Sequence, residues 1–315
     1  MNGNSLKDTN SKKILLTGVT GFLGSNLLEA LLVEDYAVMG LKRSTSDVWR
    51  IKEFLTDNKL QLIDIDKVTL DNIFAEEHID ILIHSAWSGV KVDDRNSLTI
   101  QLENFDYATK LYNLAIKAGV NKIISLGSQA EYGHYEGRVD ENYPCNPTDA
   151  YGMAKIFTSR LLQTLAEQSN ATWFWVRLFS LFGYKEDGKW LIPFAINKML
   201  NNEEINLTRC EQRYDYLFVK DFCKSIILLL NSENSGIYNL SSNNSVQLRE
   251  ILLVIKDILK SKSKLNFGAL EYRKNQVMHM EGDSTKLYKK INFAISPFVE
   301  SLIETTNYYR NNKKP

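Results

Sequence analysis

A glycine-rich turn near the start of the chain constrains the fold most strongly. Residues 14–16 (Ile-Leu-Leu) are typical of a short buried strand, and an apolar pattern with helical spacing follows at Leu27, Leu28, Leu31 and Leu32. The turn between them is Gly18-Val19-Thr20-Gly21-Phe22-Leu23-Gly24. Glycines let such a turn approach a pyrophosphate, whose charge is stabilised by free N–H groups at the helix N-terminus. We therefore predict a dinucleotide site formed by Gly18, Thr20, Gly21, Phe22, Leu23 and Gly24.

Apolar stretches of strand length recur along the first half of the chain, separated by segments long enough for helices. They lie at residues 36–41, 60–65, 79–83, 122–126 and 172–179. This alternation predicts an α/β fold, a Rossmann-type doubly wound parallel sheet over residues 13–180 that follows a polar leader at 1–12. The looser pattern of residues 181–315 indicates mainly a smaller C-terminal substrate-binding lobe, from which some segments return to the sheet. Its clearest elements are a strand at 214–219 and helices at 221–230 and 248–260.

Composition excludes several classes of function. Lys plus Arg and Asp plus Glu are both 38, so no net charge attracts nucleic acid. The longest apolar runs are far too short to span a membrane, and the first residues lack the apolar stretch of a signal peptide. Three dispersed cysteines and four histidines suggest neither a disulfide framework nor a metal site. We expect a cytoplasmic protein without metal, membrane or nucleic-acid partners.

The residue types at the end of the second predicted strand indicate which dinucleotide is bound. An acid there holds the adenosine ribose of NAD, whereas positive charge suits the 2′-phosphate of NADP. The sequence here is Lys42-Arg43-Ser44, two cations and a hydroxyl. We predict NADPH/NADP as the cofactor; the alternative interpretation is two solvated surface cations.

A tyrosine and a lysine one helical turn apart predict a proton donor. Tyr151 and Lys155 stand at the start of a helical pattern over 151–168. A nearby ammonium favours the phenolate, which helps a phenol exchange a proton near neutral pH. The same spacing occurs at Tyr216/Lys220, in a predicted strand, and at Tyr309/Lys313, in a polar terminal tail where we expect disorder. Only Tyr151 and Lys155 have a suitable scaffold.

Ser128 follows the strand at 122–126 and is the best candidate to donate a hydrogen bond to a substrate oxygen. Ligands of parallel sheets bind where strands end. The alternative role for this serine is that of a capping or loop residue.

These motifs together resemble the extended short-chain dehydrogenase/reductase superfamily, specifically its sugar-nucleotide epimerase, dehydratase and reductase group, over nearly the whole chain. The resemblance implies that Tyr151 donates the proton, that Ser128 binds the reacting oxygen, and that Lys155 also holds the nicotinamide ribose. The further cofactor contacts that it implies are Asp64 and Ile65 at the adenine, Ser85, Ala86 and Trp87 after the fourth strand, and Asn104 in the following helix.

The resemblance also implies substrate contacts. Segment 177–183 is similar to the family stretch that passes the nicotinamide, with Ser180 where Asn is usual. Residues 215–221 are similar to an Arg-Asp-Tyr-x-x-Val-x-Asp pattern, but Tyr214 takes the arginine position and Arg213 lies one residue earlier. The implied substrate-binding residues are Ser128, Gln129, Ser180, Arg213 and Arg273.

Differences within this group favour one reaction. Family dehydratases place an acid after the serine or threonine, where this chain has Gln129 and Ala130. The cationic Lys42-Arg43 signature favours a reductase that exchanges NADPH each cycle, and the sequence looks closest to the CDP-abequose and CDP-paratose synthase type of 4-ketoreductase. The resemblance thus implies reduction of a nucleoside-diphosphate 4-keto-deoxy sugar for bacterial surface polysaccharide. The alternatives are an NAD-dependent sugar-nucleotide epimerase and a non-catalytic dinucleotide-binding sensor or scaffold.

The two longest predicted helices, 95–118 and 151–168, indicate how two copies of the chain assemble. They could pair with their copies across a two-fold axis as a four-helix bundle, as in related enzymes. We therefore expect a homodimer.

Overall fold

The centre of the molecule is a seven-stranded sheet in which every neighbouring pair of strands is parallel. The structure is a computed structural model and describes residues 12–91, 93–274 and 276–312. Across the sheet the strands are β3 (Leu60–Asp64), β2 (Ala37–Lys42), β1 (Lys13–Thr17), β4 (Ile81–His84), β5 (Lys122–Ser128), β7 (Thr172–Leu178) and β11 (Gly236–Leu240). The chain runs outward from β1 to β3 and then crosses to β4 on the other side of β1, which confirms the predicted doubly wound Rossmann-type fold.

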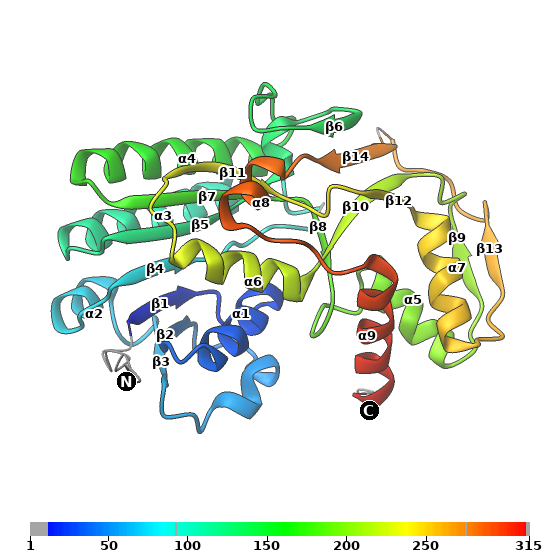
Figure 1. The fold of residues 1–315 in the computed structure, drawn as a ribbon, viewed down its shortest axis with the longest axis horizontal. Coiled ribbons are helices and arrows are strands. Elements are labelled where there is room, and N and C mark those ends of the chain that lie inside the picture. The colour runs from blue at the N-terminus through cyan, green and yellow to red at the C-terminus, as the bar shows by residue number, and fades with distance from the viewer. Residues whose placement is uncertain (1–11, 92, 275, 313–315) are drawn as a thin grey trace, which may run out of the picture.

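Helices cover both faces of this sheet (Figure 1). One face carries α1 (Phe22–Val33) and α6 (Val219–Leu230), and the other carries α2 (Leu70–Glu76), α3 (Leu98–Lys117) and α4 (Ala150–Ser169). In β1, Ile14 and Leu16 join the core cluster of α1, whereas Leu15 joins that of α3. Because successive side chains of a strand alternate, a strand buried on both faces is apolar without interruption, as residues 14–16 are.

The lobe is built on a mixed sheet beside the carboxyl ends of the central strands. Its strands are β12 (Ser245–Gln247), β10 (Arg213–Phe218), β14 (His279–Gly282) and β6 (Gly137–Val139), with β8 (Ser180–Phe182) paired to β10. A separate pair joins β9 (Ile205–Leu207) to β13 (Leu265–Phe267). Besides α6, the helices described in this half are α5 (Leu191–Leu200), α7 (Leu248–Leu259), α8 (Thr285–Ile291) and α9 (Phe298–Asn311). β11 and α6 return from this half of the chain to the central sheet (Figure 1).

The expectation of a disordered tail around Tyr309 is wrong. Tyr309 lies in α9, is buried, and donates its hydroxyl to the carbonyls of Gly183 and Glu186, 3.2 Å away in each case. The physical reason is helical periodicity, because Leu302, Thr305 and Tyr309 share one buried face of α9. Lys313, the other half of that pair, lies outside the described residues.

Within the described ranges, no helix is long and apolar enough to cross a membrane. The same residues contain no group of three or more His, Cys, Asp or Glu side chains placed to bind a metal ion.

Candidate active site

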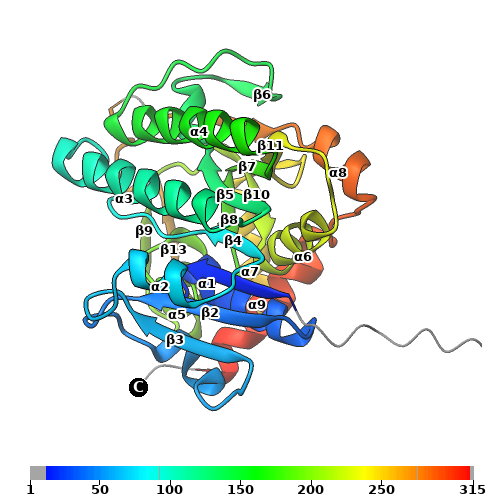
Figure 2. The same cartoon turned by 90° about the vertical axis from the view of Figure 1, so that its left-hand side faces the viewer.

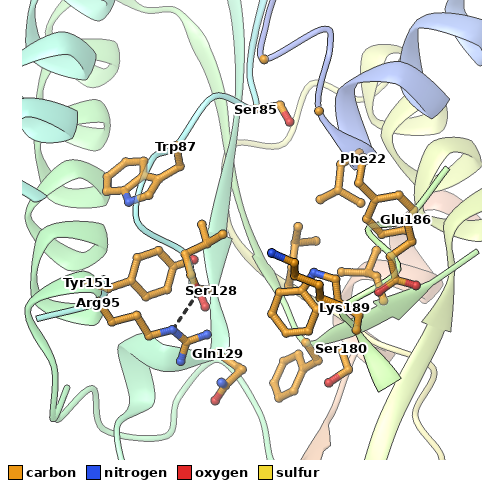
Figure 3. A pocket seen from close by; sticks show the side chains of 18 of the residues that line it. Phe22, Ser85, Trp87, Arg95, Ser128, Gln129, Tyr151, Ser180, Glu186 and Lys189 are labelled. Carbon is orange, nitrogen blue, oxygen red and sulfur yellow. Dashed lines mark hydrogen bonds between the residues drawn. The ribbon is translucent and has the colours of Figure 1, made fainter. Parts of the chain in front are cut away.

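A cleft of about 1070 Å³ lies between the carboxyl ends of the central strands and the lobe. The glycine turn, the ends of β2, β4 and β5, and the first turn of α4 form its sheet side, and segments 178–194 and 206–216 contribute to its lobe side. Figure 3 shows Trp87, Tyr151, Arg95 and Ser128 on one wall and Glu186, Lys189 and Ser180 on the facing wall. The cleft is therefore lined by residues of both the central sheet and the lobe.

The glycine turn is packed so closely that two of its glycines admit no side chain. Gly18 has φ +72°, and a Cβ on it would lie 2.8 Å from the backbone nitrogen of Ala86. A Cβ on Gly24 would lie 2.1 Å from the carbonyl oxygen of Gly18. Gly21 is the N-cap of α1, and Phe22 and Leu23, the first residues of that helix, line the cleft. This geometry fits the pyrophosphate of a dinucleotide.

Thr17 fixes the segment after β4. Its hydroxyl accepts hydrogen bonds from the backbone N–H groups of Ser85 and Ala86, 3.1 Å away in both cases, and also bonds to Nδ1 of His84. Burial lowers the pKa of His84 to about 3, so this imidazole is neutral. Ser85, Ala86 and Trp87 consequently line the cleft beside Gly18.

The residues predicted to contact the adenosine part of the cofactor fall into two groups. Lys42 and Arg43 line the cleft, as does Ile65, whereas Ser44 and Asp64 hold each other behind it through a 2.6 Å hydrogen bond. That hydrogen bond from Ser44 is the main cause that lowers the pKa of Asp64. Lys42 Nζ lies 3.7 Å from an Asp64 oxygen, so a carboxylate does accompany the cations at this end.

Tyr151 faces the cleft from the first turn of α4. Asp149 caps this helix and accepts the N–H of Gly152 at 2.7 Å, which fixes where the tyrosine lies. Burial raises the pKa of Tyr151, while a hydrogen bond with the Ser128 hydroxyl acts in the opposite direction. The phenol and Ser128 therefore form one polar unit at the end of β5.

Ser128 has the capping role considered from the sequence, and its contact with a substrate oxygen stays a prediction. Its hydroxyl accepts the N–H of Ala130 at 3.2 Å, which caps the short helix η2 (Gln129–Tyr132). Its own N–H donates to Glu131 at 2.9 Å, which completes a capping box. The cap holds the serine oxygen in position beside Tyr151.

Lys155 lies one turn after Tyr151 but does not line the cleft. Its ammonium donates to the carbonyl of Leu126 at 2.7 Å and lies 3.6 Å from the ring centre of Trp87. Burial lowers its pKa to about 7. Because Trp87 does line the cleft, its indole shields Lys155 in this structure, and the nicotinamide-ribose contact stays a prediction.

A buried ion pair between Glu131 and Arg177 holds the backbone of Ser128 in place. Glu131 is fully buried and lies 2.7 Å from Nε of Arg177, and its second oxygen accepts the N–H groups of Ser128 and Trp175. Sequence reasoning did not single out this glutamate, although the Ser-x-x-Glu spacing at 128–131 is a readable capping signal.

The predicted substrate residues are only partly brought together. Gln129, Ser180 and Arg273 line the cleft, and Ser128 lies with them. Arg213 does not, because its guanidinium donates to the carbonyl of Ser245 at 2.7 Å. Successive side chains of a strand point to opposite faces. In β10, Tyr214 therefore lines the cleft and Arg213 lies on the other face.

One further predicted residue, Asn104 of α3, can be placed. Asn104 lines the cleft and exchanges two 2.9 Å hydrogen bonds with the backbone of Ser88, which secures the loop after Trp87. Arg95, Glu186 and Lys189 also line the cleft and were missed. Glu186 and Lys189 lie in an irregular segment that no motif marks. Arg95 lies in the turn before α3, which begins at Leu98 and not at residue 95 as predicted.

A dinucleotide turn, a serine at a strand end and a tyrosine at a helix start are assembled in one cleft, which is the arrangement of the extended short-chain dehydrogenase/reductase class. Residues 14–241 match the model of the NAD dependent epimerase/dehydratase family, and the chain belongs to this family.

The curated relatives cover nearly the whole chain at low identity. CDP-abequose synthase of Salmonella muenchen is 26% identical over 302 residues, which are 93% of this chain and 97% of that protein. The dTDP-6-deoxy-L-talose 4-dehydrogenase (NAD(+)) of Aggregatibacter actinomycetemcomitans is 26% identical over 269 residues, 82% of this chain and 96% of that protein. Among solved structures, the UDP-N-acetylglucosamine 4-epimerase of Methanobrevibacter ruminantium superposes with a TM-score of 0.86 at 25% identity, covering 96% and 99% of the two chains.

Proposed function

We propose that this protein is a cytoplasmic, NADPH-dependent reductase of a nucleoside-diphosphate 4-keto-deoxy sugar, which serves bacterial surface-polysaccharide synthesis. The observation that carries the proposal is the pairing of Tyr151 with Ser128 at the end of β5, where the first acid after the serine is held in an ion pair. Glu131 is fully buried and paired with Arg177, and Gln129 and Ala130 follow the serine. A proton donor whose serine partner is not followed by an acid for removing water suits reduction of a ketone.

Each residue of the site has a separate role in such a reduction. When bound, the nicotinamide cofactor supplies hydride to the carbonyl carbon of the sugar. Ser128 donates a hydrogen bond to the ketone oxygen, and Tyr151 gives that oxygen its proton as negative charge develops on it. Lys155 places a cation behind Tyr151, 5.8 Å from its ring centre, which favours loss of the phenolic proton.

The experiment that tests this function is a panel of CDP-, dTDP-, GDP- and UDP-linked 4-keto-deoxy sugars, each incubated with the protein and NADPH. We expect one nucleotide to support loss of NADPH in equal amount to a product two hydrogens heavier. No NADPH loss with any of the four would contradict the proposal.

NADP selectivity is proposed to rest on the two cleft-lining cations of the β2 end. Replacing Lys42 and Arg43 by Glu should raise the KM for NADPH by roughly 10- to 100-fold, because charge-assisted bonds to the 2′-phosphate are lost. The KM for NADH should change far less. Lys52→Glu, an exposed cation outside the cleft, is the matched control. Equal effects on both cofactors would refute this assignment.

An epimerase with resident NAD is the second candidate. It is favoured by the superposition on a UDP-N-acetylglucosamine 4-epimerase and by the Asp64 carboxylate near Lys42. It predicts nicotinamide that stays with the protein through purification and an isomeric product without net NADPH loss. Denaturation followed by chromatography of the released nucleotide distinguishes it from the reductase.

We also propose a homodimer through α3 and α4, which lie side by side (Figure 2). Four large apolar side chains on these two helices are 44–68% exposed in the single chain: Leu98, Leu102, Met153 and Phe157. Pairing two copies of this face would bury them in a four-helix bundle.

Phe157→Glu should therefore yield a monomer at micromolar concentration, because the dimer would have to bury an unpaired carboxylate. Val33→Glu is the control, since Val33 is even more exposed but lies on α1. Sedimentation velocity measures both. A wild-type monomer would refute the dimer.

A further inference from the structure

Arg95 is a second cation beside Tyr151, on the cleft side of the phenol. Its guanidinium carbon lies 5.1 Å from the centre of the tyrosine ring, and the side chain lines the cleft. Figure 3 shows it next to Tyr151, Ser128 and Gln129. Lys155, by contrast, approaches the same ring to 5.8 Å from behind Trp87. The phenol thus lies between one shielded and one accessible cation.

The position of Arg95 is fixed at both its backbone and its side chain. Its carbonyl accepts the N–H of Tyr151 at 3.0 Å, which ties this residue to the first turn of α4. Its Nε donates to the carbonyl of Val90 at 3.1 Å, and a terminal nitrogen lies 3.8 Å from the Asp149 carboxylate. These contacts leave further guanidinium N–H groups for the cleft, because an arginine carries five.

The charges that face Tyr151 come from several elements. Asp149 at the N-terminus of α4 and Glu131 in η2 both raise the pKa of the phenol, whereas Arg95 lowers it. Glu131 is itself paired with Arg177 of β7. Lys155 is the remaining cation, and because burial lowers its pKa to about 7, its charge diminishes as the pH rises above neutral. A guanidinium stays charged throughout this range.

We propose that Arg95 is a positioning residue for Tyr151, whose permanent charge stabilises the phenolate and thereby sets the pH range in which the tyrosine gives up its proton. This inference rests on the proposed function, in which Tyr151 is the proton donor. A ligand that displaces water from the cleft strengthens the effect, because the two groups then interact through a medium of lower dielectric constant.

Fluorine NMR tests the charge relation without any turnover. Difluorotyrosine introduced at position 151 titrates in a lower pH range than tyrosine and gives a single fluorine environment to follow. We expect its midpoint to lie about one pH unit higher in Arg95→Gln than in the parent, in line with the effect of one nearby opposite charge. Arg95→Lys keeps the charge and should stay within a few tenths. Lys189→Gln removes a cation from the facing wall and should leave the midpoint unchanged.

The pH profile of turnover supplies the second readout. Reduction needs the protonated phenol, so activity falls as pH rises through the pKa of Tyr151. Removing the Arg95 charge raises that pKa, and the alkaline limb of kcat in Arg95→Gln should move up by about one pH unit. Arg95→Lys should restore the parent limb.

The outcomes separate this inference from the proposed function. Equal midpoints in the parent and Arg95→Gln would overturn the inference while leaving the reductase intact. An Arg95→Lys variant that shifts as far as Arg95→Gln would also overturn it, because the contact would then act by shape and not by charge. Shifted midpoints in a protein that reduces no 4-keto sugar would support the charge relation and refute the function.

Discussion

Tyr151→Phe should lower kcat of the reduction by roughly 10²- to 10⁴-fold, the range expected for loss of a positioned general acid. The variant keeps the ring, its edge-to-face contact with Trp87 and the cap of α4, so the cleft should keep its shape. Affinity for NADPH, measured by fluorescence titration, should stay near the wild-type value. The loss of kcat would then arise in the chemical step and not in cofactor binding.

The matched control for this variant is Tyr309→Phe. Tyr309 belongs to another Tyr-x-x-x-Lys match in the chain, but it is buried in α9 and does not line the cleft. We expect some loss of stability, since two hydrogen bonds disappear, and nearly unchanged turnover. A Tyr151→Phe enzyme with near-normal kcat would remove Tyr151 from the mechanism.

Glu131→Ala should have the largest effect on stability, a loss of about 3–5 kcal/mol in the free energy of unfolding. The substitution leaves the buried Arg177 guanidinium without its carboxylate and removes the acceptor of the Ser128 and Trp175 N–H groups. Urea unfolding measures the change. Activity per folded molecule should fall as well, because the cap that holds Ser128 is lost.

Lys110→Ala provides the comparison for this stability measurement. It breaks the 2.6 Å ion pair with Asp71, in which both side chains are more than half exposed. The free energy of unfolding should therefore fall far less than in Glu131→Ala. Glu131→Gln, which keeps the volume but not the charge, should lie between the two. An unfolding free energy of Glu131→Ala equal to that of the wild type would show that the buried pair does not stabilise the fold.

The sheet and its cofactor turn were predictable because local sequence carries their signals. Residues 14–16 are apolar on both faces, and Gly18 and Gly24 are needed where the backbone passes within 3 Å of a hypothetical Cβ. Tyr151 and Ser128 were found for a related reason. Each stands at the boundary of a regular element, where parallel sheets gather their ligands.

The remaining features depend on tertiary contacts or on register. Arg213 differs from Tyr214 by one step along β10, which places the two side chains on opposite faces. Trp87 and Lys155 are 68 residues apart in the sequence, and only the fold brings the indole over the ammonium. Tyr309 was misjudged because polar composition hid the helical period of its buried face.

The most direct test of the reductase is transfer of deuteride from NADPH in which both hydrogens at the nicotinamide C4 position are replaced by deuterium. We expect a sugar product heavier than the 4-keto substrate by one deuterium and one hydrogen, with deuterium at C4 of the sugar and an equal amount of NADP formed. A product of unchanged mass, with no NADP formed, would contradict it and identify the protein as an epimerase.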